Sequence, residues 1–130
     1  MDHHTDTEKR NLQMARDFYD KVLNGMQIEA LDRYVAVDHI QHAPAAADGL
    51  AGLRAFLEEK SKEAPKKVTF TVKRMVADGD HVIVHHHVHW EGFSGLAVVD
   101  IFRVEGDKFV EHWDVIQPIP EQSRNNNTMF

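Results

Sequence analysis

The sequence contains no cysteine among its 130 residues. This absence excludes disulfide bonds, a thiol nucleophile and cysteine-ligated metal sites, and it fits a reducing compartment, where disulfides are rare. No stretch approaches the ~18 consecutive apolar residues that a membrane-spanning helix needs. The first ten residues, MDHHTDTEKR, lack the apolar segment of a secretory signal peptide. We therefore expect a cytoplasmic protein that does not enter the membrane.

Long runs of basic residues are also absent, and the formal net charge is -6. Both features argue against a nucleic-acid partner. The chain is 42% hydrophobic and 28% charged, which is ordinary for a globular protein. Its length predicts a single domain over residues 1–130 that buries its own core.

The first half of the chain has helical patterning. Thr5 and Glu8 have the spacing of a capping box, and apolar residues then recur at helical spacing as far as Gly25. A second, short helix is expected near residues 28–35. A third helix is expected over Gly49 to Glu63, ended by Ala64-Pro65. Between the last two helices, the stretch VDHIQHAP is expected to form a short extended piece.

The second half alternates apolar and polar residues, which is typical of strands. We expect four antiparallel strands: one from Lys67 to a turn at Asp78-Gly79, then 81–91, 96–104 and 108–117. Helices followed by strands predict an α+β fold, in which N-terminal helices pack on one face of a curved, mainly antiparallel sheet. The space between the two layers is a natural ligand pocket.

The last two strands carry carboxylates within apolar surroundings. A three-residue loop, Glu105 to Asp107, would pair Asp100 with His112 and Val98 with Asp114, placing Asp100, His112, Asp114 and Phe102 on one face. A two-residue Gly106-Asp107 loop would shift the register by one and separate Asp100 from this group. We prefer the three-residue loop. A buried aspartate beside a histidine could be a general base with a raised pKa or a structural pair that satisfies buried polar groups.

The run HHHVH places His85, His87 and His89 on one strand face and His86 on the other. The spacing of Gly79, His85, His87 and Glu91 imitates the first metal-binding motif of cupins. A Val stands near position 98 where that motif needs glycine, and the second motif is missing. We therefore predict no bound metal. One member of the run is expected to face the pocket, and the others to lie on the surface or at a subunit contact.

Three further residues are candidates for the pocket. His39 and His42 lie between helical and extended segments, where pocket rims form, although each could be a surface histidine. Tyr19 could direct its hydroxyl into the pocket from the first helix. Trp113 and Phe109 are expected on the opposite sheet face from Asp114. An exposed apolar sheet face usually meets a partner, so we predict a homodimer through the outer face.

Several pieces together resemble one family. They are YVAVDHIQHAP followed by DG, then LAVVDIFRV, KFVEHWDVIQPIP and the tail NNNTMF. Over nearly its whole length the chain resembles SnoaL-like polyketide cyclases of the nuclear transport factor 2-like superfamily. The resemblance implies a cone-shaped α+β barrel, a homodimer, a cofactor-free pocket and an aldol condensation with a strand aspartate as general acid/base. Asp114 matches that aspartate, Asp100 is its neighbour, and His42, His85 and His87 match pocket residues.

The sequence thus predicts a cofactor-free lyase or isomerase that acts on a small carbonyl compound. Asp114 would abstract a proton, and Asp100 and His112 would tune it. The substrate would contact a second set of residues: His39, His42, His85, His87, Tyr19 and Phe102. Two alternatives stay open, a non-catalytic dimer that binds a small molecule and a histidine-ligated metal enzyme.

Overall fold

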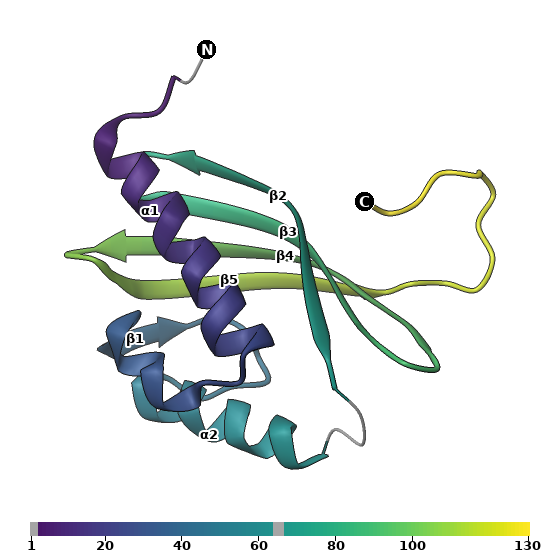
Figure 1. Cartoon of the computed structure of the whole chain (residues 1–130), viewed down its shortest axis with the longest axis horizontal. Helices are drawn as coiled ribbons and strands as arrows, with labels where there is room; N and C mark the ends of the chain where they lie inside the picture. Colours follow the sequence, from purple (N-terminus) through teal and green to yellow (C-terminus); the bar gives the residue numbers. More distant parts are fainter. Residues whose placement is uncertain (1–2, 64–66) are drawn as a thin grey trace.

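A computed structural model describes residues 3–63 and 67–130, and it confirms the α+β architecture (Figure 1). Three helical segments precede most of the strands: α1 (Asp6–Asp17) with its continuation η1 (Phe18–Asn24), η2 (Ile28–Arg33) and α2 (Gly49–Glu63). The strands are β1 (Val35–Gln41), β2 (Thr69–Asp78), β3 (His81–Trp90), β4 (Phe93–Glu105) and β5 (Lys108–Pro118). The predicted stop of the third helix at Ala64-Pro65 lies outside the described residues.

The sheet has five strands rather than four, in the order β1-β5-β4-β3-β2. β1 is the extended piece predicted between the second and third helices, and it pairs in parallel with β5, so the sheet is mixed. The other neighbours are antiparallel, as expected. This extra strand matters for function because it brings its polar residues beside those of β5.

The first helix begins as the sequence predicts. The Thr5 hydroxyl accepts from the Glu8 backbone N–H, and the Glu8 carboxylate accepts from the Thr5 N–H. The helix widens to π geometry in η1 and ends at Gly25. A Cβ at Gly25 would lie 2.6 Å from the Lys21 carbonyl oxygen, so only glycine fits there without a shift.

The core lies between this helix and the inner face of the sheet (Figure 1). Phe18 packs edge-on against Phe109 with ring centroids 5.4 Å apart, and Phe102 stacks on Phe109 at 4.4 Å. On α2, by contrast, Leu57 is the one residue among those described that is buried, while Leu53 and Phe56 are half-buried. The helix α2 therefore leaves a hollow on its inner side instead of closing onto the sheet.

The β4–β5 hairpin differs from the prediction in its loop. Glu105 pairs with Lys108, so the loop has two residues. Gly106 and Asp107 both have positive φ, which is the requirement of the tight hairpin turn that matches the twist of the strands. The predicted three-residue loop and its pairs, Asp100 with His112 and Val98 with Asp114, are wrong.

A β-bulge then restores the predicted face. Val104 pairs with Phe109 and Arg103 with Glu111, so Val110 is an extra residue. Beyond the bulge, Asp100 lies opposite Asp114 and Phe102 opposite His112. These four side chains share the inner face, as predicted. The bulge also turns Phe109 inward into the core, which corrects its predicted outward position.

The outer face of the sheet carries Trp113, as predicted, and the chain's C-terminal tail. The Trp113 ring stacks on His42 with centroids 4.8 Å apart. The tail (residues 119–130) leaves β5 and returns towards β2 and β3 (Figure 1), where the Phe130 ring lies 4.6 Å from that of His87. A homodimer through this face stays a prediction.

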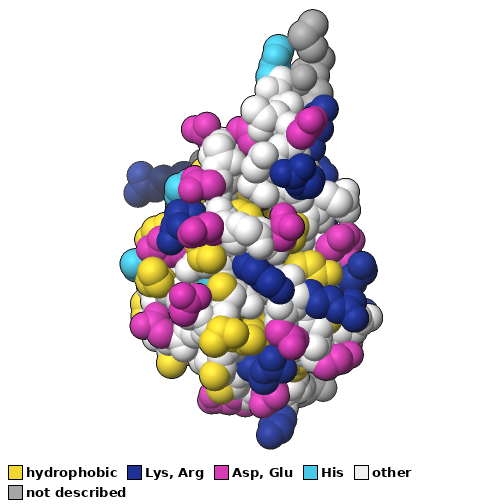
Figure 2. Space-filling view, turned by 90° about the vertical axis from the view of Figure 1, so that its left-hand side faces the viewer, with side chains coloured by type: hydrophobic (Ala, Val, Ile, Leu, Met, Phe, Trp, Pro, Cys, Tyr) yellow, Lys and Arg dark blue, Asp and Glu magenta, His cyan; other side chains and the backbone are white. Residues whose placement is uncertain are grey.

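Charges of both signs are mixed over the face shown in Figure 2, and no basic stripe crosses its described residues. The absence of a nucleic-acid partner stays a prediction. Within the described residues, no helix is both long and apolar enough to cross a membrane.

Candidate active site

A cavity of about 860 Å³ lies between the helices and the inner face of the sheet. Its walls are apolar: Leu53 and Phe56 come from α2, Val88 and Trp90 come from β3, and Leu96 comes from β4. Its polar lining on the sheet comes from four strands, which contribute His39, His86, Asp100, His112 and Asp114. Polar side chains gathered inside a mainly apolar cavity are the usual composition of a small-molecule site.

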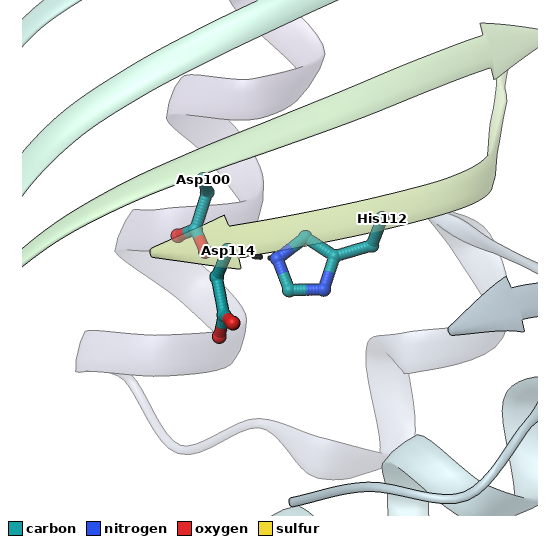
Figure 3. A group of neighbouring side chains, drawn as sticks. All are labelled: Asp100, His112 and Asp114. Carbon is teal, nitrogen blue, oxygen red and sulfur yellow. Dashed lines mark hydrogen bonds and ion pairs between the residues drawn. The ribbon is translucent and has the colours of Figure 1, made fainter. Parts of the chain in front are cut away.

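Strand alternation and pairing bring these polar groups together. His112 and Asp114 lie two residues apart on β5, so both face inward. Asp100 is paired with Asp114 across the β4–β5 ladder. Figure 3 shows the two carboxylates on adjacent strands, with the His112 ring turned towards Asp100.

Asp100 is a buried carboxylate that accepts three hydrogen bonds. The donors are the Tyr19 hydroxyl, His86 Nε2 at 2.7 Å and His112 Nε2 at 2.8 Å. Burial alone would raise the pKa of Asp100, but the hydrogen bonds from His112 and His86 outweigh it and hold the pKa well below the ordinary value of 3.8. Asp100 is therefore ionised at neutral pH.

Asp114 is in the opposite situation. It is half-buried and lines the cavity, and no described residue donates a hydrogen bond to its carboxylate. Burial raises the pKa of Asp114 above its ordinary 3.8; Asp100 raises it further, while His112 and His86 counteract part of the rise. The cluster thus contains one carboxylate whose lone pairs are largely occupied and one that is available to a ligand.

His39 lines the cavity from β1 and is 2% exposed. Its Nδ1 lies 3.0 Å from the Phe109 carbonyl oxygen, which can only accept, so Nδ1 carries the hydrogen. Burial lowers the pKa of His39 below its ordinary value of 6.5. The ring is therefore neutral at neutral pH.

Tyr19 and Phe102 lie close to the places predicted for them. Phe102 lines the cavity. Tyr19 is fully buried, and its hydroxyl donates a hydrogen bond to Asp100. Tyr19 therefore supports the polar cluster instead of facing a substrate.

Three predicted pocket histidines lie outside the cavity. His85 and His87 are on the outer face against Phe130, because strand alternation turns them away from His86. His42 is also outside, where its Nε2 is 2.7 Å from Glu111. Their predicted positions in the pocket are wrong.

His86 is the member of HHHVH that faces the pocket, and the prediction had assigned it no role. A signal for it exists in the sequence, since His86 shares its strand face with the apolar residues Val84 and Val88. Gln41, which contacts His112 Nδ1 at 2.7 Å, was also missed. Its position depends on the parallel β1–β5 pairing, for which the sequence has no local signal.

Ligand atoms of Asp100, His112 and Asp114 lie within 4.8 Å of one another, close enough to consider a metal ion. However, His112 Nε2 is directed at Asp100, and the Asp100 oxygens already accept three hydrogen bonds. A cation would have to break these bonds to gain its ligands. The arrangement therefore favours a hydrogen-bonded cluster over a metal centre.

Comparisons with solved structures show the same fold. A proposed ketosteroid isomerase from Kribbella flavida superimposes with a TM-score of 0.74 at 21% identity, covering 95% of this chain and 89% of that one. A proposed polyketide cyclase from Acidithiobacillus ferrooxidans gives a TM-score of 0.69 at 19% identity, with 89% and 91% covered. A proposed SnoaL-like polyketide cyclase from a Jannaschia species gives 0.75 at 12% identity, with 89% and 91% covered.

A search of curated protein sequences found no match to this chain. The family model of the SnoaL-like domain matches residues 15–112, which include η1, β1, α2 and the strands as far as His112. This match and the shared fold agree with the resemblance seen in the sequence. The chain belongs to the SnoaL-like domain family, within the nuclear transport factor 2-like superfamily.

Proposed function

We propose that the protein is a cofactor-free enzyme of the cyclase or isomerase type, with Asp114 as general acid/base. The observation that supports this role is the Asp114 carboxylate on the wall of an apolar cavity, which has a raised pKa and accepts no hydrogen bond from any described residue. A carboxylate with a raised pKa is better matched to proton transfer near neutral pH than an ordinary one. Asp100 would not compete for this role, because its lowered pKa makes it a weak base and its oxygens already accept three hydrogen bonds.

In the proposed reaction, Asp114 removes a proton from the carbon beside a substrate carbonyl. The electrons of that C–H bond form an enolate. In an isomerisation, Asp114 returns the proton to another carbon of the same conjugated system. In a cyclisation, the enolate carbon forms a bond to a second carbonyl carbon, and Asp114 gives its proton to the new alkoxide. Both routes regenerate the carboxylate and need no external oxidant or reductant.

The size and lining of the cavity support an apolar carbonyl compound as substrate. A volume of about 860 Å³ accommodates a molecule of drug size. The apolar walls would hold the hydrocarbon part, and the carbonyl end would lie near Asp114. Family relatives with cyclase and isomerase names are consistent with this class of chemistry.

The test is hydrogen–deuterium exchange at carbon, followed by NMR in D₂O with a panel of cyclic ketones and 1,3-diketones. We expect the enzyme to accelerate exchange and Asp114→Asn to lower the rate by about 10²- to 10⁴-fold, the usual contribution of a general base. The rate should also fall as the pH decreases, because protonation of Asp114 removes the base. The midpoint of this fall should lie above pH 3.8, because the pKa of Asp114 is raised.

The matched control is Asp38→Asn, since Asp38 is an exposed aspartate on β1. It should leave the exchange rate unchanged. An unchanged rate in Asp114→Asn would sink the proposed role. Tight binding of the same ketones by the wild-type protein, without exchange, would favour the binding-only alternative.

A further inference from the structure

We propose that Gln41 is a positioning residue that keeps His112 doubly protonated and thereby sets how readily Asp114 takes up a proton. The first part of this inference depends only on hydrogen-bond geometry. The second part rests on the proposed function of Asp114. Gln41 is the last residue of β1, and parallel pairing places it beside His112 on β5.

The orientation of the Gln41 amide is fixed by the backbone. The Ala43 N–H donates to Gln41 Oε1 at 3.0 Å. A backbone N–H can only donate, so the atom that faces it must be the amide oxygen and not the amide nitrogen. The backbone around it is held as well, because the Gln41 N–H donates to Asp48 Oδ1 at 2.7 Å and the His42 N–H donates to the His112 carbonyl at 2.9 Å.

Both ring nitrogens of His112 face acceptors. Nδ1 lies 2.7 Å from Gln41 Oε1, and an amide oxygen only accepts, so Nδ1 carries a hydrogen. Nε2 lies 2.8 Å from Asp100 Oδ1, and an ionised carboxylate only accepts, so Nε2 carries a hydrogen too. An imidazole with hydrogen on both nitrogens is a cation. The ring is held in place by stacking on Phe102, with centroids 4.8 Å apart.

The other cavity histidines lack this double constraint. His86 Nε2 faces Asp100, but its Nδ1 is buried and has no partner among the described residues. His39 Nδ1 faces a carbonyl, and its buried Nε2 likewise has no partner. A second proton on either ring would place an unpaired N–H in the interior, which is costly. His112 is thus the positive charge in the described part of the cavity's polar cluster.

This charge acts on Asp114. The titratable groups near His112 are Asp100 from β4, His86 from β3 and His39 from β1, with Tyr19 behind Asp100. With His112 charged, the Asp100–His112 pair is neutral, and Asp114 can ionise beside it. With His112 neutral, Asp114 would face an uncompensated carboxylate, and like charges favour the protonated acid. Gln41 would therefore influence the base through His112, without touching the substrate.

The test uses the full-length protein labelled with ¹⁵N, and it reads the side-chain nitrogen shifts of His112 at pH 7. The signals are assigned by their loss in His112→Gln. We expect two protonated nitrogens in the wild type. Gln41→Leu removes the acceptor and should give a neutral ring that keeps hydrogen on Nε2 alone. Gln41→Glu is the matched control, since a carboxylate also accepts from Nδ1, and it should keep both hydrogens.

A neutral His112 ring in the wild-type protein would overturn the inference, even if Gln41→Leu did not fold. A doubly protonated ring in folded Gln41→Leu would overturn it as well. In the exchange assay, the rate falls at low pH as Asp114 is protonated, and we call this fall the acid limb. Gln41→Leu should move the acid limb to higher pH by about one unit. Changed nitrogen shifts with an unmoved acid limb would contradict the catalytic role of Asp114, while the positioning of His112 by Gln41 would stand.

Discussion

Asp100 and Asp114 face each other across the β4–β5 ladder, yet their surroundings shift their pKa values in opposite directions. Burial raises the pKa of both carboxylates, but hydrogen bonds from His112 and His86 bring that of Asp100 below its ordinary value, whereas no described residue donates a hydrogen bond to Asp114. Two groups of the same chemistry can serve as a fixed charge and as a proton acceptor when their surroundings separate their pKa values. The separation comes from the histidine donors on two other strands, β3 and β5.

Asp100→Asn should destabilise the protein strongly. The change leaves the Tyr19, His86 and His112 donors without a charged acceptor, and breaking a buried ion pair by removing one partner costs about 3 to 5 kcal/mol. Urea unfolding at pH 7 measures the difference. Asp38→Asn, at an exposed position, should stay within about 0.5 kcal/mol of the wild type.

The stability of Asp100→Asn relative to the wild type should also depend on pH. Because the folded-state pKa of Asp100 is lowered, its contribution to stability is complete above the unfolded value of about 3.8 and is lost as the pH falls below it. The stability difference between wild type and Asp100→Asn should therefore shrink as the pH falls from about 5 to about 2. A difference that stays constant over this window would mean that Asp100 is not the stabilising charge.

Tyr19→Phe removes one donor to Asp100 and keeps the buried ring. Hydrogen bonds to charged groups contribute about 1.5 to 3 kcal/mol, so we expect a loss of that size in urea unfolding. Tyr34→Phe is the matched control, because Tyr34 is also buried against Phe18 but its hydroxyl has no hydrogen-bond partner among the described residues. Equal losses in the two variants would show that the Tyr19 hydroxyl contributes nothing specific.

Leu53→Trp should fill the cavity and prevent ligand binding. Leu53 lies half-buried on α2 and lines the cavity, so a larger side chain there would occupy space that a ligand needs. Displacement of an apolar fluorescent dye measures the effect, and we expect at least a tenfold weaker affinity, equivalent to about 1.4 kcal/mol. Ala55→Trp places the same side chain on the exposed side of α2 and should bind the dye as the wild type does.

The sequence predicts most elements of the fold because their signals are local. The capping box at Thr5 and Glu8, the bounds of α2 and the period of the strands all depend on neighbouring residues. The pairing of β1 with β5 does not, since it joins Gln41 to His112 across 71 positions of the chain. The role of Gln41 could therefore not be predicted from the pattern.

The strand pairing at the site is also set by features that the local sequence pattern does not reveal. Alternation predicts that Asp100, His112 and Asp114 share a face, and this is confirmed. The reason differs from the prediction, because a two-residue loop and the bulge at Val110 together replace the three-residue loop. A slip of one residue exchanges the two faces of a strand, and neither change is visible in the hydrophobic period alone.

Hydrogen bonds link Gln41 to His112, His112 to Asp100, and Asp100 to both His86 and Tyr19. This hydrogen-bond network crosses β1, β5, β4 and β3 and ends on η1, so it connects four neighbouring strands to a helix. Any redesign of the protein for a new ligand must leave this network intact. The apolar side chains of α2 are the place to alter selectivity, because they shape the cavity without holding the sheet together.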